Sequence, residues 1–383
     1  MVSLAALWGW RRQGSKQRSS LNGRIVIVGS GKMARNIGLY AASRGFAPSF
    51  VSRVPERLEA VRSWAKKRLR RFSSLGVGPE SASFHLAGDA ELPAAELVIE
   101  SVEEDREAKV KALGSLPELT VSQSLLSSNS SSILPSELHP LALGLHFFYP
   151  VELTGFVEAV LPDGFAEVKR LRLRSLCAAL GLQVLEQSEA QAFCVNELLL
   201  PLQNESLLAL EQGCPPSEVE LGSSFGLLGA GQLSLMDSVG LDVVLAAATN
   251  YLRRMPAERA EAFVPLTRVL GRLCALGKRG AKNGDGLLCG APLPYAPDPG
   301  AKADPAIFRC SFLNSCLWAL GQGRVQPAEL ELVWSHLLGA SMSFEQALGA
   351  MPEAELARRL EDLFTRTGRW YFSRAASWAE SRT

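Results

Sequence analysis

The sequence predicts an N-terminal α/β domain followed by repeated all-helical domains, and three observations support this prediction. A β-branched run ends in a glycine-rich turn just before a helical pattern, over residues 24–46. Residues 127–158 place serines, a histidine and a glutamate at the ends of short apolar runs. Two helical segments, which contain Asn204 and Asn314, share a pattern at an offset of 110 positions. The length of 383 residues suits two or three domains.

The composition is that of an ordinary globular chain, with 47% hydrophobic and 21% charged residues. A net charge of +1 gives no whole-chain attraction to nucleic acid, so we expect no such partner. The seven cysteines are scattered and form no CxxC, so neither a disulfide framework nor a metal site is predicted, and a reducing cytoplasm is favoured. No apolar stretch reaches the roughly 18 residues of a membrane span, so we expect no membrane partner.

The first 22 residues are basic and contain no acid. This composition is shared by mitochondrial transit peptides, but the apolar segment is short and no cleavage signal is clear. We therefore expect residues 1–22 to be a loosely ordered extension and favour a cytoplasmic location over mitochondrial import. The basic residues are Arg11, Arg12, Lys16 and Arg18.

The glycine-rich turn after the first apolar run predicts a Rossmann-type, doubly wound sheet that binds a dinucleotide. Gly29, Gly31 and Ala34 form G-x-G-x-x-A between a strand pattern and a helix pattern. The first glycine permits the turn, the second lets a pyrophosphate approach the backbone, and the small third residue allows close helix packing. The pyrophosphate would lie at the helix N-terminus, where free N–H groups favour an anion. Lys32 and Met33 belong to the same cofactor-binding turn.

The second strand, PSFVSR, ends in Ser52 and Arg53. Folds of this kind that bind NAD place an acidic residue there, because a carboxylate accepts hydrogen bonds from the ribose 2′-hydroxyl. Serine followed by arginine can instead hold the 2′-phosphate of NADP. Alternatively, Arg53 stacks on adenine or faces water. NAD and NADP therefore both remain open as the cofactor, with NADP suggested by Ser52 and Arg53.

His146 and Glu158 are the candidate acid/base pair. His146 follows the apolar run LALGL and precedes FFYP, which predicts the end of a short buried strand that turns at Pro150. A histidine there can exchange a proton with an alcohol if a second group holds its ring and stabilises the cation. Glu158, inside the run GFVEAV, is that group, because a carboxylate buried alone is costly. The competing interpretation is a structural histidine whose hydrogen bonds are made within the fold, and a glutamate at the edge of the sheet.

The stretches SSNSSSI, GLHFFYPV and FVEAV resemble the (S)-3-hydroxyacyl-CoA dehydrogenase family, whose pattern runs SNTSSL, GLHFFNPV and LVEV with the same twelve-residue step from histidine to glutamate. The chain departs from this pattern at Tyr149, where the family usually has asparagine, and its serine-to-histidine interval is shorter. The resemblance implies an oxidoreductase that interconverts 3-hydroxyacyl and 3-oxoacyl thioesters with a nicotinamide cofactor. It implies an acyl-CoA or an acyl-carrier thioester as substrate.

The resemblance also implies roles for five further residues. Ser131 and Asn196 would position the substrate oxygens, although each has a competing role in helix capping. The serine could also be Ser128, Ser130 or Ser132. Asn129 belongs with the cofactor site. Glu104 and Lys109 would lie near the nicotinamide ribose; the competing interpretation is a solvated helix start with acids at its positive end.

A basic cluster follows the second strand, in the stretch VRSWAKKRLRRF, which we expect to form one helix. Clusters of cations suit the phosphates of coenzyme A, whereas the competing interpretation is a solvated helix face. The cluster consists of Arg62, Lys66, Lys67, Arg68, Arg70 and Arg71.

The helical part resembles the C-terminal domain of the same family, and GQLSLMDSVGLDVV suggests a structural role for Asp237. It begins with CVNELLLPLQNESLLALEQG, which we expect to be a long amphipathic helix. In the repeat, the position of Asn196 falls on Ala306, so the second copy is degenerate and we expect it to bury the apolar face that single-copy relatives bury by dimerising. His336 is then a helix-packing residue, and the chain is a monomer or a homodimer. The expected segments are 1–22 (extension), 23–188 (Rossmann domain), 189–291 (helical domain) and 292–383 (second copy), with a proline-rich linker over 291–305.

Two other functions remain open from the residues. One is a dehydrogenase of a small free hydroxy acid or of a carrier-bound acyl group. The other is a catalytically inactive relative that acts as a binding or scaffold subunit, which the missing acidic residue at Ser52 and the change at Tyr149 would allow.

Overall fold

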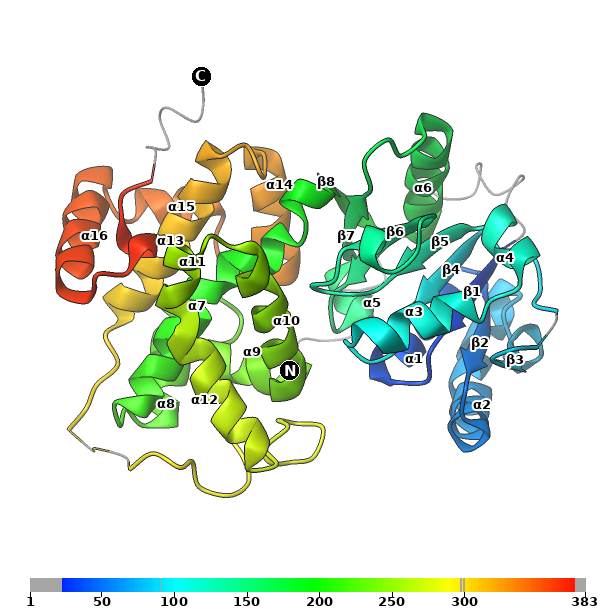
Figure 1. The fold of residues 1–383 in the computed structure, drawn as a ribbon, viewed down its shortest axis with the longest axis horizontal. Helices are drawn as coiled ribbons and strands as arrows, with labels where there is room; N and C mark the ends of the chain where they lie inside the picture. The colour runs from blue at the N-terminus through cyan, green and yellow to red at the C-terminus, as the bar shows by residue number, and fades with distance from the viewer. Residues whose placement is uncertain (1–22, 90, 297, 299, 376–383) are drawn as a thin grey trace. The chain divides into compact units, whose positions relative to one another are not determined.

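The computed structural model describes residues 23–375 except 90, 297 and 299 (Figure 1). The expected N-terminal extension lies outside the described residues. The chain divides into two compact units. The sheet unit comprises the described residues up to Ser130 together with Pro135–Glu186, and the helical unit comprises Ser131–Leu134 with the described residues from Gln187 onward.

The sheet unit is built on one eight-stranded sheet in the order β3-β2-β1-β4-β5-β6-β7-β8. The pairs from β3 across to β6 are parallel, and β6 pairs with β7 in the antiparallel sense. This topology confirms the predicted α/β sheet. The strands are β1 (Arg24–Val28), β2 (Ala47–Ser52), β3 (Ser83–Leu86), β4 (Leu97–Glu100), β5 (Leu125–Ser128), β6 (Ala142–Phe147), β7 (Phe156–Leu161) and β8 (Gln183–Ser188).

Central strands such as RIVIV are apolar throughout because parallel strands are covered by helices on both faces. On one face, side chains of α1, α2 and α6 form the hydrophobic core with Ile25, Ile27 and Ile99. The helices of this unit are α1 (Lys32–Ser43), α2 (Pro55–Leu69), α3 (Arg106–Gly114), α4 (Glu118–Gln123), α5 (Val151–Thr154) and α6 (Glu167–Leu180). Short 3₁₀ segments cover Arg70–Leu75, Pro79–Ser81 and Pro135–Glu137.

The basic cluster does not lie on one helix, so that expectation is wrong. The helix α2 ends at Leu69, and Arg70–Leu75 continue as a 3₁₀ segment that Gly76 ends with a φ of +76°. Left-handed backbone of this kind is tolerated best by glycine, and it stops the helix. The cations are therefore divided between two segments.

The helical unit confirms an all-α part after the sheet. Its helices are α7 (Cys194–Glu211), α8 (Pro216–Ser224), α9 (Gln232–Val239), α10 (Leu241–Arg254), α11 (Ala257–Ala260), α12 (Val264–Ala275), α13 (Pro305–Gly321), α14 (Pro327–Leu332), α15 (Phe344–Gly349) and α16 (Glu353–Thr367). Shorter turns cover Glu189–Gln191, Glu261–Phe263 and Trp370–Phe372 (3₁₀) and Val333–Leu337 (π). The aspartate Asp237 accepts hydrogen bonds from the backbone N–H groups of Leu287 and Leu288, which confirms its structural role.

The helix α7 is not amphipathic, contrary to the expectation. Fourteen of its 18 residues are buried, because α13 packs along it and α12 also contacts it (Figure 1). A helix that is buried on most of its sides is a core helix rather than a surface helix.

The two helical segments that share a sequence pattern also share helix bounds. At an offset of 110, α7 would map to residues 304–321, and α13 covers Pro305–Gly321. After one inserted residue, α8 begins at Pro216 and α14 at Pro327. The paired asparagines Asn204 and Asn314 are both fully buried. The residues described within 291–304 form no helix, and the domain boundaries at 188 and 291 stay predictions.

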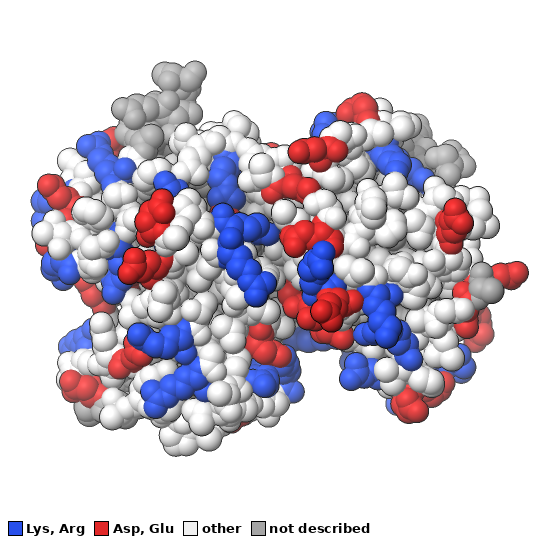
Figure 2. Space-filling model, in the orientation of Figure 1, with Lys and Arg blue, Asp and Glu red and all other residues white. Residues whose placement is uncertain are grey.

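His336 is exposed, so its expected packing role is wrong. It lies in the π-helical segment Val333–Leu337, in which Trp334 is the fully buried side chain. On the face that Figure 2 shows, basic and acidic side chains are interspersed.

Among the described helices none is by itself long and apolar enough to cross a membrane. Only α9 and α10, a pair with a sharp bend between them, reach that length and hydrophobicity when they are taken together.

Candidate active site

The antiparallel pairing of β6 with β7 places His146 directly opposite Glu158. Opposed residues project to the same face of a sheet, so the side chains meet. The His146 Nδ1 lies 2.8 Å from the Glu158 Oε2. Glu158 is fully buried and His146 is 7% exposed, so the alternative of an edge glutamate is wrong. With Nδ1–H donated to the carboxylate, Nε2 is the unprotonated nitrogen of the neutral ring and can accept a proton.

Asn129 supports this strand end rather than projecting freely. Its side-chain oxygen accepts a hydrogen bond of 2.8 Å from the backbone N–H of Phe147, the residue after His146. The backbone N–H of Asn129 donates in turn to the carbonyl of Glu100 at 2.7 Å. The ring of Phe148 lies against the imidazole, with 4.2 Å between centroids. The histidine is therefore held by contacts from its ring and from the backbone that follows.

The turn from β1 to α1 has the shape that a pyrophosphate requires. Gly29 has a φ of +145°, and a Cβ there would lie 2.4 Å from the carbonyl oxygen of Ser101, so a side chain has no room. A Cβ on Gly31 would meet nothing within 4 Å, which shows open space at the N-terminus of α1. Ala34 is fully buried beneath the turn. These residues fit a dinucleotide, whose phosphates would accept from the N–H groups of α1.

The side chain of Lys32, the first residue of α1 after this turn, contacts Tyr149. Its Nζ lies 3.5 Å from the centre of the Tyr149 ring, a cation–π contact. Tyr149 is 38% exposed. Met33 is partly buried against the core of the sheet unit. The residue that departs from the family's asparagine therefore contacts the cofactor turn.

Ser52 and Arg53 lie where β2 ends. Ser52 is 7% exposed, and its Oγ accepts a hydrogen bond of 3.3 Å from the backbone N–H of Val54. The side chain of Arg53 is 36% exposed and pairs with Glu103 at 3.4 Å. No carboxylate is therefore supplied at the end of β2 itself.

A buried charge network lies at the ends of β4 and β5. The Lys109 Nζ is 3.1 Å from both carboxylate oxygens of Glu100 and 3.4 Å from Glu104, and all three side chains are at most 9% exposed. The alternative of a solvated helix start is therefore wrong for Glu104 and Lys109. Burial alone would lower the pKa of the Lys109 amine, but the two carboxylates outweigh it and the pKa is raised.

Sequence reasoning missed Glu100, which is fully buried and also accepts a hydrogen bond of 2.5 Å from Ser128. The signal was present, because Glu100 ends the apolar run LVIE and a carboxylate buried there must have partners. Ser130 donates to Glu104 at 2.7 Å and so joins the same network.

In the helical unit, Asn196 and Ser131 are brought together by Tyr251. The Asn196 Nδ2 lies 3.1 Å from the Tyr251 hydroxyl and 3.4 Å from the Ser131 carbonyl oxygen. The Tyr251 hydroxyl donates to that same carbonyl. Asn196 does not cap α7, since Phe193 holds that position. Tyr251 was missed, because no local pattern connects it to residues that precede it by 55 and 120 positions.

In the described residues, metal-ligand side chains and two buried cysteines provide no further reactive centre. No group of three or more His, Cys, Asp or Glu side chains within 23–375, where described, is arranged to hold a metal ion. Burial raises the pKa of the Cys177 thiol to about 12 and that of Cys310 to about 11, so neither is a ready thiolate at neutral pH.

Known proteins resemble this chain over both units. Residues 24–186 match the family described as 3-hydroxyacyl-CoA dehydrogenase, NAD binding domain, and residues 193–289 match 3-hydroxyacyl-CoA dehydrogenase, C-terminal domain. The 3-hydroxybutyryl-CoA dehydrogenase of Mycobacterium tuberculosis H37Rv is 30% identical over 283 residues, which cover 69% of this chain and 96% of the relative. A probable 3-hydroxybutyryl-CoA dehydrogenase of Bacillus subtilis 168 is 27% identical over 241 residues, or 58% of this chain and 83% of the relative.

A solved structure shares the fold over nearly the whole chain. The crystal structure of 3-hydroxybutyryl-CoA dehydrogenase from Escherichia coli K12 covers 94% of this chain and 98% of its own, with a TM-score of 0.73 and 19% identity. At that identity the likeness concerns the fold alone, but its coverage extends to the helices that follow residue 305.

Proposed function

The chain belongs to the 3-hydroxyacyl-CoA dehydrogenase family and is an oxidoreductase of that type, and we propose that it interconverts 3-hydroxyacyl-CoA and 3-oxoacyl-CoA thioesters. The observation that carries this proposal is the buried pair of His146 and Glu158, 2.8 Å apart on opposed strand positions. Relatives named as 3-hydroxybutyryl-CoA dehydrogenases support the substrate class.

The residues of this chain supply the proton chemistry. In the oxidative direction the His146 Nε2 accepts the proton of the 3-hydroxyl group, and Glu158 stabilises the imidazolium that forms. In the reductive direction the same nitrogen returns the proton to the carbonyl oxygen. A nicotinamide cofactor held at the turn of Gly29 and Gly31 would supply the hydride chemistry at the substrate C3. Hydroxyl proton and hydride together account for the two hydrogens that distinguish alcohol from ketone.

Ser131 and Asn196 are the proposed positioning groups for the substrate oxygens. The contact with Tyr251 supports this role for Asn196, because a fixed side-chain amide loses little freedom when it binds a ligand. An inactive scaffold subunit is disfavoured, because burying the charge of Glu158 costs free energy. In an active enzyme, the attraction between Glu158 and the imidazolium of His146 offsets this cost.

We propose that the cofactor site accepts NADP(H) as well as NAD(H). Ser52 brings no negative charge to repel a 2′-phosphate, which is how such sites reject NADP. Arg53 is exposed and pairs only at 3.4 Å with Glu103, so a phosphate can replace the carboxylate. Ser52→Asp should weaken NADPH binding about tenfold or more, by the usual energy of a charged contact. Equal Kd values for NADPH in wild type, Ser52→Asp and Arg53→Ala would contradict this reasoning.

The proposed carrier is coenzyme A, with the exposed cations of α2 near its phosphates. Lys66, Lys67 and Arg68 are exposed, a position that also suits a solvated face. The proposed location is the cytoplasm, since all seven cysteines are free thiols, as in reducing compartments. The proposed assembly is a monomer, because α13 already covers α7.

The proposed activity is tested by oxidation of NADH and of NADPH in the presence of acetoacetyl-CoA, followed by absorbance. We expect turnover with acetoacetyl-CoA. We expect a higher KM with acetoacetyl-pantetheine, because this substrate lacks the phosphates of coenzyme A. No turnover with either thioester, together with reduction of a free oxo acid such as acetoacetate in the same assay, would favour the alternative substrate class.

A further inference from the structure

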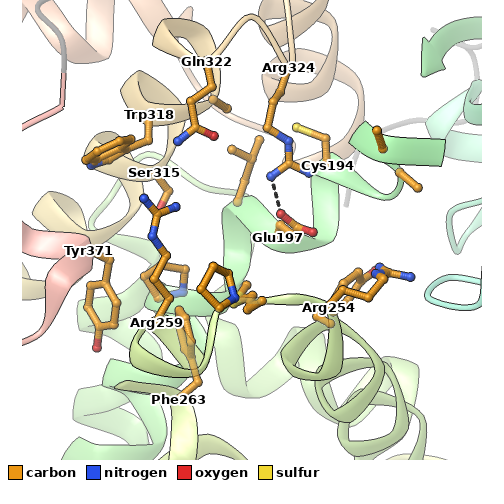
Figure 3. A pocket seen from close by; sticks show the side chains of 18 of the residues that line it. Cys194, Glu197, Arg254, Arg259, Phe263, Ser315, Trp318, Gln322, Arg324 and Tyr371 are labelled. Atoms are coloured by element: carbon orange, nitrogen blue, oxygen red, sulfur yellow. Dashed lines mark hydrogen bonds and ion pairs between the residues drawn. The ribbon is translucent and has the colours of Figure 1, made fainter. Parts of the chain in front are cut away.

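A cavity of about 500 Å³ lies wholly within the helical unit, among α7, α13, the end of α10 and the turn Trp370–Phe372 (Figure 3). Cavities of this size are typical of sites for small organic ligands. Much of its wall is apolar, with Phe263, Trp318 and Trp370 among the lining side chains.

Arg259 enters this cavity in an unusual setting. Its guanidinium carbon lies 5.6 Å from the Trp318 ring centre and 4.9 Å from that of Trp370, and the two indoles are nearly perpendicular, at 81°. Figure 3 shows the side chain extending toward Ser315 and Trp318. Among the described residues no carboxylate lies within ion-pair distance of Arg259. The two rings therefore hold a cation in place while its N–H edge remains available.

The neighbouring charges leave this cation uncompensated. Glu197 is paired with Arg324, as the dashed line in Figure 3 shows, so its charge is already matched. Arg254 also lines the cavity and donates one N–H to the Ser132 carbonyl at 2.6 Å. The lining thus contains three arginines against two glutamates, Glu189 and Glu197. A positive, largely apolar cavity favours a ligand that is apolar and anionic.

We infer that this cavity binds a small apolar or aromatic molecule that carries a carboxylate, with the carboxylate on Arg259. A guanidinium presents two parallel N–H donors that match the two oxygens of a carboxylate. The indoles, Phe263 and the adjoining prolines would contact the apolar body. This site uses neither His146 nor the cofactor turn, and it shares with the candidate active site the residue Tyr251, which contacts Asn196. It goes beyond the proposed function, and its test measures binding rather than turnover.

The first test uses the wild-type full-length chain and needs no variant. Isothermal titration calorimetry with 4-phenylbutyrate should show saturable binding at one site. Its neutral amide should bind about 10- to 100-fold more weakly, since a hydrogen bond to a charged group is worth about 1.5–3 kcal/mol. Absence of binding, or equal affinities for acid and amide, would overturn the inference. Inorganic phosphate that competes as well as 4-phenylbutyrate would do so too, because the apolar wall would then contribute nothing.

The second test assigns the binding to Arg259. Arg259→Gln should weaken 4-phenylbutyrate binding about 10- to 100-fold and leave the affinity for the amide unchanged. The matched control is Arg253→Gln, which alters an exposed arginine on α10 outside the cavity and should leave both affinities unchanged. Thermal unfolding of each variant shows that the fold is retained. If Arg259→Gln binds the acid as tightly as wild type, the site does not work through Arg259.

Discussion

Replacing Glu158 by glutamine removes the charge that faces His146 and keeps the size and the hydrogen bond. The glutamine oxygen can still accept from the Nδ1–H, so the ring keeps its orientation on the opposed strand. What is lost is the attraction between carboxylate and imidazolium in the transition state. At an effective dielectric constant of about 20 and charge centres about 4 Å apart, that attraction is about 4 kcal/mol. A loss of this size lowers kcat about 10³-fold, and we expect about 10²- to 10³-fold because dipoles of the amide compensate in part.

The assay is NADH oxidation with acetoacetyl-CoA, with cofactor affinity measured separately by fluorescence. Glu158→Gln should lower kcat and leave the Kd for NADH within about twofold, because β4, β5 and β6 lie between β7 and β1, the strand that leads into the cofactor turn. The control is Glu152→Gln, an exposed glutamate on α5, which should behave as wild type. His146→Gln should lower kcat about 10²- to 10⁴-fold, and the double variant little further, since the two residues act as one unit. Activity of Glu158→Gln within a fewfold of wild type would refute the dyad.

Three predictions concern stability. Lys109→Met leaves Glu100 buried without its cation and should destabilise the sheet unit by about 3–5 kcal/mol in urea unfolding; an unchanged midpoint would mean that water enters the network. Burial raises the pKa of Glu205 although Arg369 opposes the shift, so the stability that this carboxyl contributes is present at low pH and lost as pH rises through its folded-state pKa. The melting temperature of Glu205→Gln minus that of wild type should therefore be higher at pH 8 than at pH 4. An equal difference at the two pH values would contradict this sign. Truncation to residues 1–290 should uncover α7 and cause dimerisation or aggregation in light scattering, whereas a soluble, normally melting monomer would show that the second copy is an independent domain.

Local patterns were sufficient to predict the elements that carry the chemistry. The β-branched run RIVIV, followed by Gly29 and a helix pattern, requires only short-range geometry, and the structure has β1, the turn and α1 at these residues. The position of His146 near the end of β6, which ends at Phe147, was predicted in the same way, from an apolar run and a following proline. The exact opposition of His146 to Glu158 then needed the register of two strands, which the twelve-residue spacing indicated only through the family resemblance.

Predictions failed where burial depended on a distant segment. The helix α7 was expected to have a solvated side, but α13, about 110 positions later in the chain, covers it. From the sequence, Lys109 could be interpreted as a surface residue. In the structure it is buried and pairs with Glu100, which lies at the end of a different element. Hydrophobic periodicity within one element reports which side is apolar and cannot reveal which other element packs there.

The sequence by itself determined the cofactor turn and the strand that carries His146, because each depends on backbone preferences within a few residues, and it named His146 and Glu158 as the candidate acid/base pair. Only the tertiary structure decided which groups share a site: the buried network around Glu100, the contact of Asn196 with Tyr251, and the cavity around Arg259. These arrangements arise from side-chain packing and desolvation between segments far apart in the chain, where the cost of burying a charge selects its partner and no local pattern records the choice.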